Sequence, residues 1–234
     1  MTIAELIDKR DNVELVRDQI AAILVTESAA QVVLATAAAE EDDDIDPDLW
    51  RLRVFTERVT PWEVFRDDPN HVAGTNDVAP VVNVWFENDQ FDRSASDTVE
   101  RQRTKARINV DVLGWAKATA TEIGHQTSDV LAAAECERAA RLVRNILMAG
   151  EYTYLGMQGT VCERWLASRT TMQIPVDATP NAERLKAQRL GFDVTFNEFS
   201  PQVASVPLAA ITTRVKRTEQ GELYLIETEQ FPEE

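Results

Sequence analysis

Apolar residues at helical spacing predict a long helix near the start of the chain. Between Asp11 and Leu24 they recur at steps of three and four, which places them on one helical face. Asp11 or Asn12 is suited to cap this helix at its N-terminus. The apolar positions are Val13, Val16, Ile20, Ile23 and Leu24.

The stretch that follows, from Ser28 to Ala39, is apolar and rich in alanine. It either prolongs the helix or forms a first strand through Val32, Val33 and Leu34. Periodicity alone does not separate these two structures in a short apolar run.

A second long helix is predicted to begin at Thr127 or Ser128, both good N-caps, and to end at Gly150. At about 1.5 Å per residue it would span roughly 30 Å, enough to cross a sheet of several strands. Its core stripe would consist of Leu131, Ala134, Leu142, Val143, Ile146 and Leu147.

Alternating apolar and polar residues predict a sheet. The clearest segment is Lys105 to Trp115, in which one face carries Ala106, Ile108, Val110 and Val112 and the other carries Lys105, Arg107, Asn109 and Asp111. Similar alternation, with one irregularity in the first segment, predicts strands over Leu49 to Val59, Val81 to Phe86, Val161 to Met172 and Arg189 to Phe199. We expect the first strands to form a meander, in an antiparallel sheet covered by helices on one face.

A hairpin is predicted at the end of the chain, with strands at Ile211 to Arg217 and Leu223 to Ile226 around a turn at Gly221. A lone hairpin is barely stable in water, so it must lie on its own sheet or on a neighbouring subunit. The expected fold class is therefore α+β: a small, mostly antiparallel sheet flanked by two long helices, with extended loops and a C-terminal β-hairpin arm. We divide the chain into a core of residues 1–205, with the N-terminal helix and inserted loops, and an arm of residues 206–234.

Composition and charge narrow the range of possible functions. The chain has 234 residues and a formal net charge of −16. Such acidity argues against a nucleic-acid-binding protein, because affinity for phosphate comes from clustered Lys and Arg. It serves either solubility or a lining past which DNA slides without sticking. Cys136 and Cys162 are expected to be buried free thiols in a reducing compartment.

No apolar run in the sequence reaches the roughly 18 residues expected of a membrane span. The N-terminus also lacks the basic-then-apolar pattern of a secretory signal. These features predict a soluble protein that is cytoplasmic when made.

Motifs that carry chemistry are not found. His71 and His125 lie in polar, loop-like contexts, and the sequence shows no nucleophile elbow, phosphate loop, dinucleotide fingerprint or zinc-protease helix. The acidic run from Glu40 to Asp48 lacks the spacing of a calcium loop and fits a solvated loop. We therefore predict no catalytic residue, no cofactor site and no metal site, and expect that the protein is not an enzyme.

Arg138, Arg141 and Arg144 recur every three residues on the second helix of an otherwise acidic chain. This basic stripe is either a solvated face, with Glu137 and Arg141 forming an i,i+4 pair, or a contact for acidic loops of an adjacent subunit; DNA binding is the remaining alternative. Tyr152 and Tyr154 follow the helix. We expect these tyrosines, with one or two of the tryptophans near the strands, to anchor a subunit interface. The tryptophans are Trp50, Trp62, Trp85, Trp115 and Trp165.

Three phrases of the sequence, read with the predicted order of elements, resemble tail-completion and neck proteins of long-tailed bacteriophages, above all the tail-terminator group. The likeness covers about Leu49 to Gln202 and then the hairpin. It is a likeness of element order and phrasing, without a catalytic fingerprint. The phrases are Arg107 to Gly114 (RINVDVLG), Glu137 to Leu147 (ERAARLVRNIL) and Phe192 to Gln202 (FDVTFNEFSPQ).

The resemblance implies a virion subunit with a small mixed sheet flanked by two helices, made in the host cytoplasm. Such subunits form a homo-oligomeric ring, usually a hexamer, that caps the finished tail tube and offers a docking surface to the head connector. Related neck proteins form collars or gateways of other ring sizes. The implied partners are further copies of the chain, tail-tube or sheath proteins and connector proteins, with DNA only as passing cargo and no membrane.

Two segments depart from a minimal terminator: the acidic loop from Glu40 to Asp48 and a long loop from Glu87 through Gln102. We expect them to act as arms that hold neighbours or a sheath. Two alternatives stay open at this point. One is a baseplate or capsid-associated component, and the other is an acidic inhibitor or DNA-mimic protein that occupies a basic partner.

Overall fold

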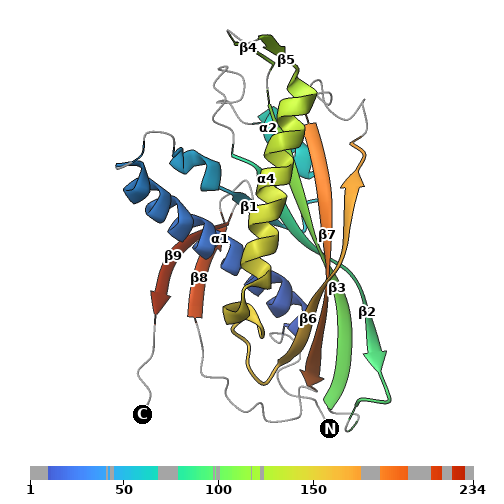
Figure 1. The fold of residues 1–234 in the computed structure, drawn as a ribbon. Helices are drawn as coiled ribbons and strands as arrows, with labels where there is room; N and C mark the ends of the chain where they lie inside the picture. The colour runs from blue at the N-terminus through green and yellow to red at the C-terminus, as the bar shows by residue number, and fades with distance from the viewer. Residues whose placement is uncertain are drawn as a thin grey trace.

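A computed structural model gives the fold of the chain, which is α+β with a five-stranded mixed sheet and two long helices (Figure 1). Side chains are described throughout these residues except in the C-terminal hairpin, the short hairpin at 119–126 and residues 66–67. The structure describes residues 10–40, 42, 45–67, 79–96, 98, 101–116, 118–121, 124–174, 185–199, 212–217 and 223–229.

The central sheet has the strand order β1-β2-β3-β7-β6. Strands β2, β3, β7 and β6 pair antiparallel with one another in that order, whereas β1 runs parallel to β2. The expected meander is therefore wrong at its first strand. A meander needs a hairpin between consecutive strands, whereas the connection from β1 to β2 contains a 3₁₀ turn, η2 (Pro61–Glu63), and a helical turn, α2 (Val64–Asp67). The strands are β1 (Arg53–Thr56), β2 (Val81–Asp92), β3 (Arg101–Trp115), β6 (Val161–Met172) and β7 (Leu185–Phe199).

Helices α1 (Asn12–Ala39) and α4 (Ser128–Met148) cover one face of this sheet. The apolar faces predicted for β3 and for the start of α1 enter one buried core, which also takes alternate residues of β7. Gly114 on β3 allows the close approach of α4, since a Cβ there would lie 2.4 Å from the backbone nitrogen of Cys136. The expected α4 stripe is correct for its second half, but Ala134 is exposed.

The first turn of α1 is fixed by a residue far away in the sequence. Asp11 is the N-cap, as expected, but its side chain makes no capping hydrogen bond. Instead, the backbone N–H of Asn12 donates to the carboxylate of Glu198 on β7, and the Asn12 amide donates to the carbonyl of Asn197 at 2.7 Å. A carboxylate at this helix end also interacts favourably with the helix dipole.

The opposite face of the sheet carries a smaller core at one end. Phe55, Leu113 and Trp115 are buried there beneath η2 and α2. Asn83 fixes this connection, because its side chain donates to the carbonyl of Arg58 at 2.9 Å and accepts from the Arg58 N–H at 3.0 Å. Helical segments therefore cover parts of both faces of the sheet. The prediction that helices cover only one face was wrong.

Helix α1 continues through Ala39, which resolves the ambiguous stretch in favour of helix. By length and composition alone it is a candidate membrane span, so the expectation that no apolar segment is long enough was wrong. One such helix is weak support for a membrane protein, since the core helices of soluble proteins can have the same length and apolar composition. The first half of α1 is a core helix here: Val16, Ile20 and Leu24 are buried against the sheet.

The segment expected to be a long loop, Glu87 through Gln102, is in part a continuation of the sheet, because β2 runs to Asp92 and β3 begins at Arg101. The expected strand over Leu49 to Val59 is shorter than predicted, because η1 (Pro47–Trp50) precedes the four residues of β1. The segment from Val161 to Met172 is β6, with the predicted bounds.

The remaining elements are short. Strands β4 (Thr119–Thr121) and β5 (Gly124–Gln126) pair with each other, and η3 (Gly150–Tyr152) follows α4. At the C-terminal end, β8 (Thr212–Arg217) pairs antiparallel with β9 (Leu223–Glu229), and β9 lies against α1 and β1. The predicted turn at Gly221 lies outside the described residues.

Candidate subunit interface

The outer side of α4 carries the predicted arginines. Arg141 is exposed, whereas Arg138 and Arg144 are half-buried. Arg138 pairs with Glu135 on the same helix, its Nε lying 3.1 Å from the carboxylate, and Arg144 contacts the side-chain oxygen of Asn145 at 3.1 Å. The expected pair between Glu137 and Arg141 is not formed, and within the described residues Arg141 has no ion pair.

The three arginines do not form one line along the helix. A step of three residues turns about 300° around a helix axis, so successive arginines shift by about 60°. Arg138 and Arg144 therefore lie on opposite flanks of Arg141, about 120° apart. A straighter row is formed by Val130, Ala134, Glu137, Arg141 and Met148, all of them exposed. We call this row the α4 ridge.

The lower end of α4 is held by residues of other elements. Arg164 on β6 donates to the carbonyl of Ala149, the C-cap of α4, at 2.7 Å, and also to the carbonyl of Tyr152 in η3. The Tyr152 hydroxyl donates to Glu27 of α1. Burial, and then the hydrogen bond to Glu27, raises the pKa of Tyr152 above its ordinary range.

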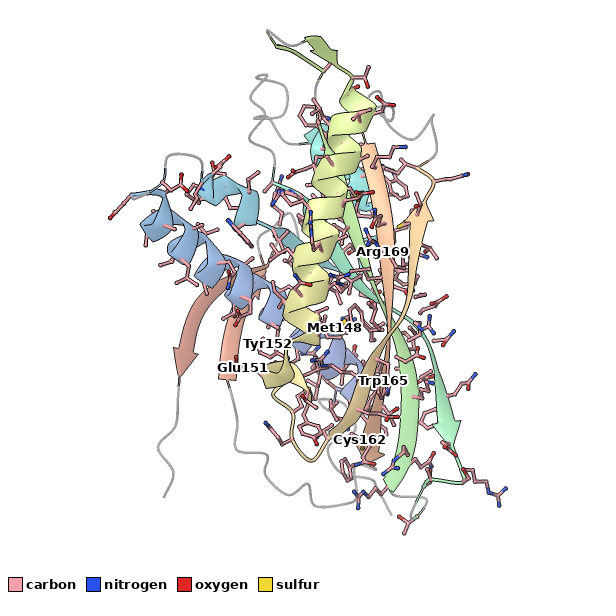
Figure 2. All side chains as sticks on the ribbon, viewed as in Figure 1. Met148, Glu151, Tyr152, Cys162, Trp165 and Arg169 are labelled. Carbon is pink, nitrogen blue, oxygen red and sulfur yellow. The ribbon has the colours of Figure 1, made fainter. Side chains whose placement is uncertain are left out.

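The two tyrosines therefore differ. Tyr152 is engaged inside its own chain, while Tyr154 is exposed and available for contact. Figure 2 shows Met148, Glu151 and Tyr152 gathered at this end of the helix. The role of both tyrosines as interface anchors stays a prediction.

The uncovered part of the far sheet face is polar and ion-paired. Asp111, itself buried, accepts two hydrogen bonds from Arg189 at 2.7 and 3.0 Å and one from the Trp85 indole at 2.9 Å. Hydrogen bonding to Asp111 raises the pKa of Arg189, whose guanidinium also lies 4.6 Å from the centre of the Trp85 ring. The charge of Arg189 is thus already matched within the chain.

A second group of charges on this face surrounds Gly191. Asp193 binds Arg107 at 2.5 Å and Lys105 at 3.3 Å. The Arg107 guanidinium lies over Gly191, where a Cβ would come within 3.0 Å of it and within 2.5 Å of the Ser168 hydroxyl. This face therefore does not present unmatched basic groups to a phosphate backbone at Arg107 or Arg189.

No family model matches the chain, and no curated protein matches it.

The second half of α1 is the surface that sequence reasoning missed. Residues 28–39 extend beyond the sheet (Figure 1), and we call them the arm. Val33 is 68% exposed and Leu34 is 62% exposed. With Ala30 and Ala37, which are also exposed, they form an i, i+3, i+4, i+7 row that we call the arm stripe.

The signal for the arm stripe was present in the sequence. The i, i+3, i+4, i+7 spacing of the arm stripe is typical of a helix face. It was not recognised because the apolar residues of this segment fit a helix and a strand equally well. The opposite side of the arm includes the buried Ser28 and Ala35.

Strand β6 is an edge of the sheet, paired on one side with β7. Its exposed Trp165 (Figure 2) is 65% accessible, and its indole N–H contacts Glu163 at 3.3 Å. Two register shifts interrupt the pairing with β7, at Val161/Glu163 and at Leu166/Ser168. Such bulges are a common means of discouraging unwanted pairing at a sheet edge.

The cysteines are free, as predicted. Cys136 is buried, whereas Cys162 is only half-buried, contrary to expectation. Burial raises the pKa of Cys136 to about 11, so its thiol is neutral at physiological pH. Among the residues that the structure describes, no group of three or more His, Cys, Asp or Glu side chains is placed to hold a metal ion. His71 and the His125 side chain lie outside the described part of the chain.

Proposed function

We propose that the chain is a structural virion protein of the neck or tail end of a long-tailed bacteriophage. In this proposal its copies form a ring that terminates the tail tube and joins it to the head connector. The observation that carries the proposal is the placement of the three resembling phrases. Their described residues fall on β3, α4 and β7, the elements that form the centre of the domain.

The arrangement of the two helices is a further support. Tail-terminator subunits are expected to have a small mixed sheet flanked by two helices, and α1 and α4 both pack on a mixed sheet here. We also propose that the fold is a mostly antiparallel sheet with two long helices. In this proposal the C-terminal hairpin, residues 206–234, is an appendage separate from the core of residues 1–205. Strands β8 and β9 form a two-stranded sheet of their own, which supports this division, and β9 lies against α1 and β1 of the core.

A ring subunit needs two different surfaces that complement each other, because a head-to-tail contact joins unlike patches. The chain offers such a pair. The arm is apolar and precedes an acidic run, whereas the α4 ridge carries Arg141 without an ion pair among the described residues. A closed set of identical head-to-tail contacts generates a ring.

DNA fits this proposal as passing cargo. The net charge is −16, and three basic residues of the open sheet face are paired with carboxylates: Arg189 with Asp111, and Arg107 and Lys105 with Asp193. Because affinity for DNA depends on basic groups that release counterions, such a protein lets DNA slide through without binding it. The proposal assigns the chain no catalytic step, no cofactor and no membrane.

Imaging of virions tests the proposal directly. Particles carrying a label on this chain should show density at the junction of head and tail, in a ring around the tail axis. A label on the baseplate or the capsid shell would assign the chain to another virion component. A protein absent from particles, and bound one-to-one to a basic partner in the host, would instead be an acidic inhibitor.

A further inference from the structure

The arm stripe is an apolar helix face without cover. Ala30, Val33, Leu34 and Ala37 point away from the buried side of α1, and residues 28–39 contain no charged side chain. Rows of this spacing are the ones that helices use to pack against a partner helix. The exposed ends of the α4 ridge, Val130 and Met148, are apolar as well.

The two surfaces match in the spacing of apolar and charged residues. Along the α4 ridge, Arg141 precedes Met148 by seven residues, which is about 10 Å of helix. Along the arm, Glu40 follows Val33 by seven residues. The charge lies N-terminal to the apolar group on α4 and C-terminal to it on α1. Antiparallel packing therefore sets Val33 against Met148 and Glu40 against Arg141.

The sequence around the arm favours a protein partner over a lipid surface. Seven of the nine residues from Glu40 to Asp48 are acidic, and no Lys or Arg occurs between Arg17 and Arg51. Helices that lie on membranes carry Lys or Arg on their polar face, because biological membranes present anionic lipid. This arm would be repelled there, whereas the α4 ridge offers Arg141 with Arg144 beside it.

A copy does not reach its own ridge with its own arm. The first half of α1 is buried in the core beside α4, and the arm then extends away from the sheet (Figure 1). A contact between the arm and the ridge would therefore join two copies, and it would be head-to-tail because the arm and the ridge are different surfaces.

We propose that the arm stripe of one copy packs antiparallel on the α4 ridge of the next copy, with Glu40 and Asp42, which follow the arm, facing Arg141 and Arg144. This inference rests on the proposed ring and names the two surfaces that join its subunits. It predicts that the charges on the two surfaces can be exchanged.

A charge exchange tests the contact. One variant carries Glu40→Lys and Asp42→Lys on the arm, and the other carries Arg141→Glu and Arg144→Glu on α4. Each variant alone places like charges across every contact, so its dissociation constant should rise at least about 100-fold by sedimentation velocity. A 1:1 mixture restores opposite charges at every contact and should assemble with nearly wild-type affinity.

The matched control is Arg10→Glu with Lys105→Glu, two exposed cations outside both surfaces, which adds the same negative charge as the α4 variant and should leave the dissociation constant unchanged. Circular dichroism of each variant confirms that it is folded. Wild-type assembly by either single-surface variant would overturn the contact. So would a mixture of folded variants that fails to recover assembly.

Cross-linking separates this inference from the ring itself. In a Cys162→Ser background, Leu34→Cys and Met148→Cys in the same chain should give a ladder of disulfide-linked oligomers, while either cysteine alone should give no higher species than a dimer. A ladder without closed rings would support the contact and overturn the ring. Closed rings that give no ladder and tolerate charge reversal would overturn the contact and leave the ring standing.

A vesicle assay examines the competing partner. Wild-type protein should not float with vesicles of phosphatidylcholine and phosphatidylglycerol. Flotation that is abolished by Val33→Asp with Leu34→Asp, together with absence of self-association, would assign the arm to a lipid surface and overturn the proposal.

Discussion

Single residues decide how closely the layers of this molecule approach each other. At Gly114, a Cβ would lie 2.4 Å from the nitrogen of Cys136 and 2.7 Å from the carbonyl oxygen of Ala132. These are backbone atoms of α4, so the helix itself must shift to accept a side chain. The sequence contains Gly114 as one glycine at the end of a strand, and nothing local indicates that a helix crosses it.

We expect Gly114→Ala to lower the free energy of unfolding by about 1–3 kcal/mol, the usual cost of overpacking a core. Urea denaturation measures this change. Gly150→Ala is the matched control, because a Cβ there meets no atom within 4 Å. It should change stability by less than about 0.5 kcal/mol. Equal effects of the two substitutions would show that α4 is not seated on Gly114.

Cys136 predicts how stability depends on pH. Its pKa in the fold is about 11, raised chiefly by burial, and its Sγ lies 3.3 Å from the carbonyl of Val112. An unfolded thiol ionises near pH 8.5. The raised pKa therefore contributes stability that is fully present below about pH 8.5 and is lost as the pH rises toward 11.

The measurement compares wild type with Cys136→Ala. From pH 8 to pH 10.5 the wild type should lose about 2–3 kcal/mol more free energy of unfolding than the variant, since the variant has no thiol to ionise. Parallel pH curves for the two proteins would contradict a buried, neutral Cys136.

At the scale of elements, prediction succeeded where one face of a segment is buried. The alternation in β3 and β6 and the stripe in α4 reflect burial on one side, so they were visible in sequence. The extension of β2 and β3 beyond the core was missed, because Glu87 to Asp92 has few buried residues and so little alternation. Parallel pairing of β1 was missed because strand patterns do not record which neighbour a strand pairs with.

The candidate interface was predictable only in part. The arginines of α4 follow from spacing, but their spread over both flanks of the helix requires the helical angle to be worked out for each. The ion pair between Arg107 and Asp193 joins residues 86 apart in sequence, so no local pattern reveals it. The arm stripe could be predicted only if residues 28–39 were known to be helical. Periodicity did not decide between helix and strand there.

The C-terminal hairpin gives a prediction for a whole element. Removing Pro207 to Glu234 should leave a folded subunit that assembles poorly, because the five-stranded sheet and the buried core lie before that point. The truncation also uncovers the part of α1 that β9 contacts. Circular dichroism should retain the helical signal, while sedimentation should show loss of the large species. A loss of helical signal would place the hairpin in the core.

The molecule as a whole combines an acidic surface, one face of core helices and two unlike surfaces on α1 and α4. A monomeric binding protein needs only one contact surface, whereas a ring subunit needs two that fit each other. In the proposed ring, the separation of the arm from the α4 ridge (Figure 1) is what lets one copy contact the next. The account has one central claim, which is that copies of this chain close into a ring.

Native mass spectrometry of the purified, full-length chain tests that claim most directly. A ring predicts one closed homo-oligomer, with a hexamer favoured, whose subunit number stays constant as concentration is lowered until it falls apart into monomers. The mass is read against a chain of 26.3 kDa. A chain that remains monomeric at every concentration, or that binds a basic partner one-to-one, would contradict the account.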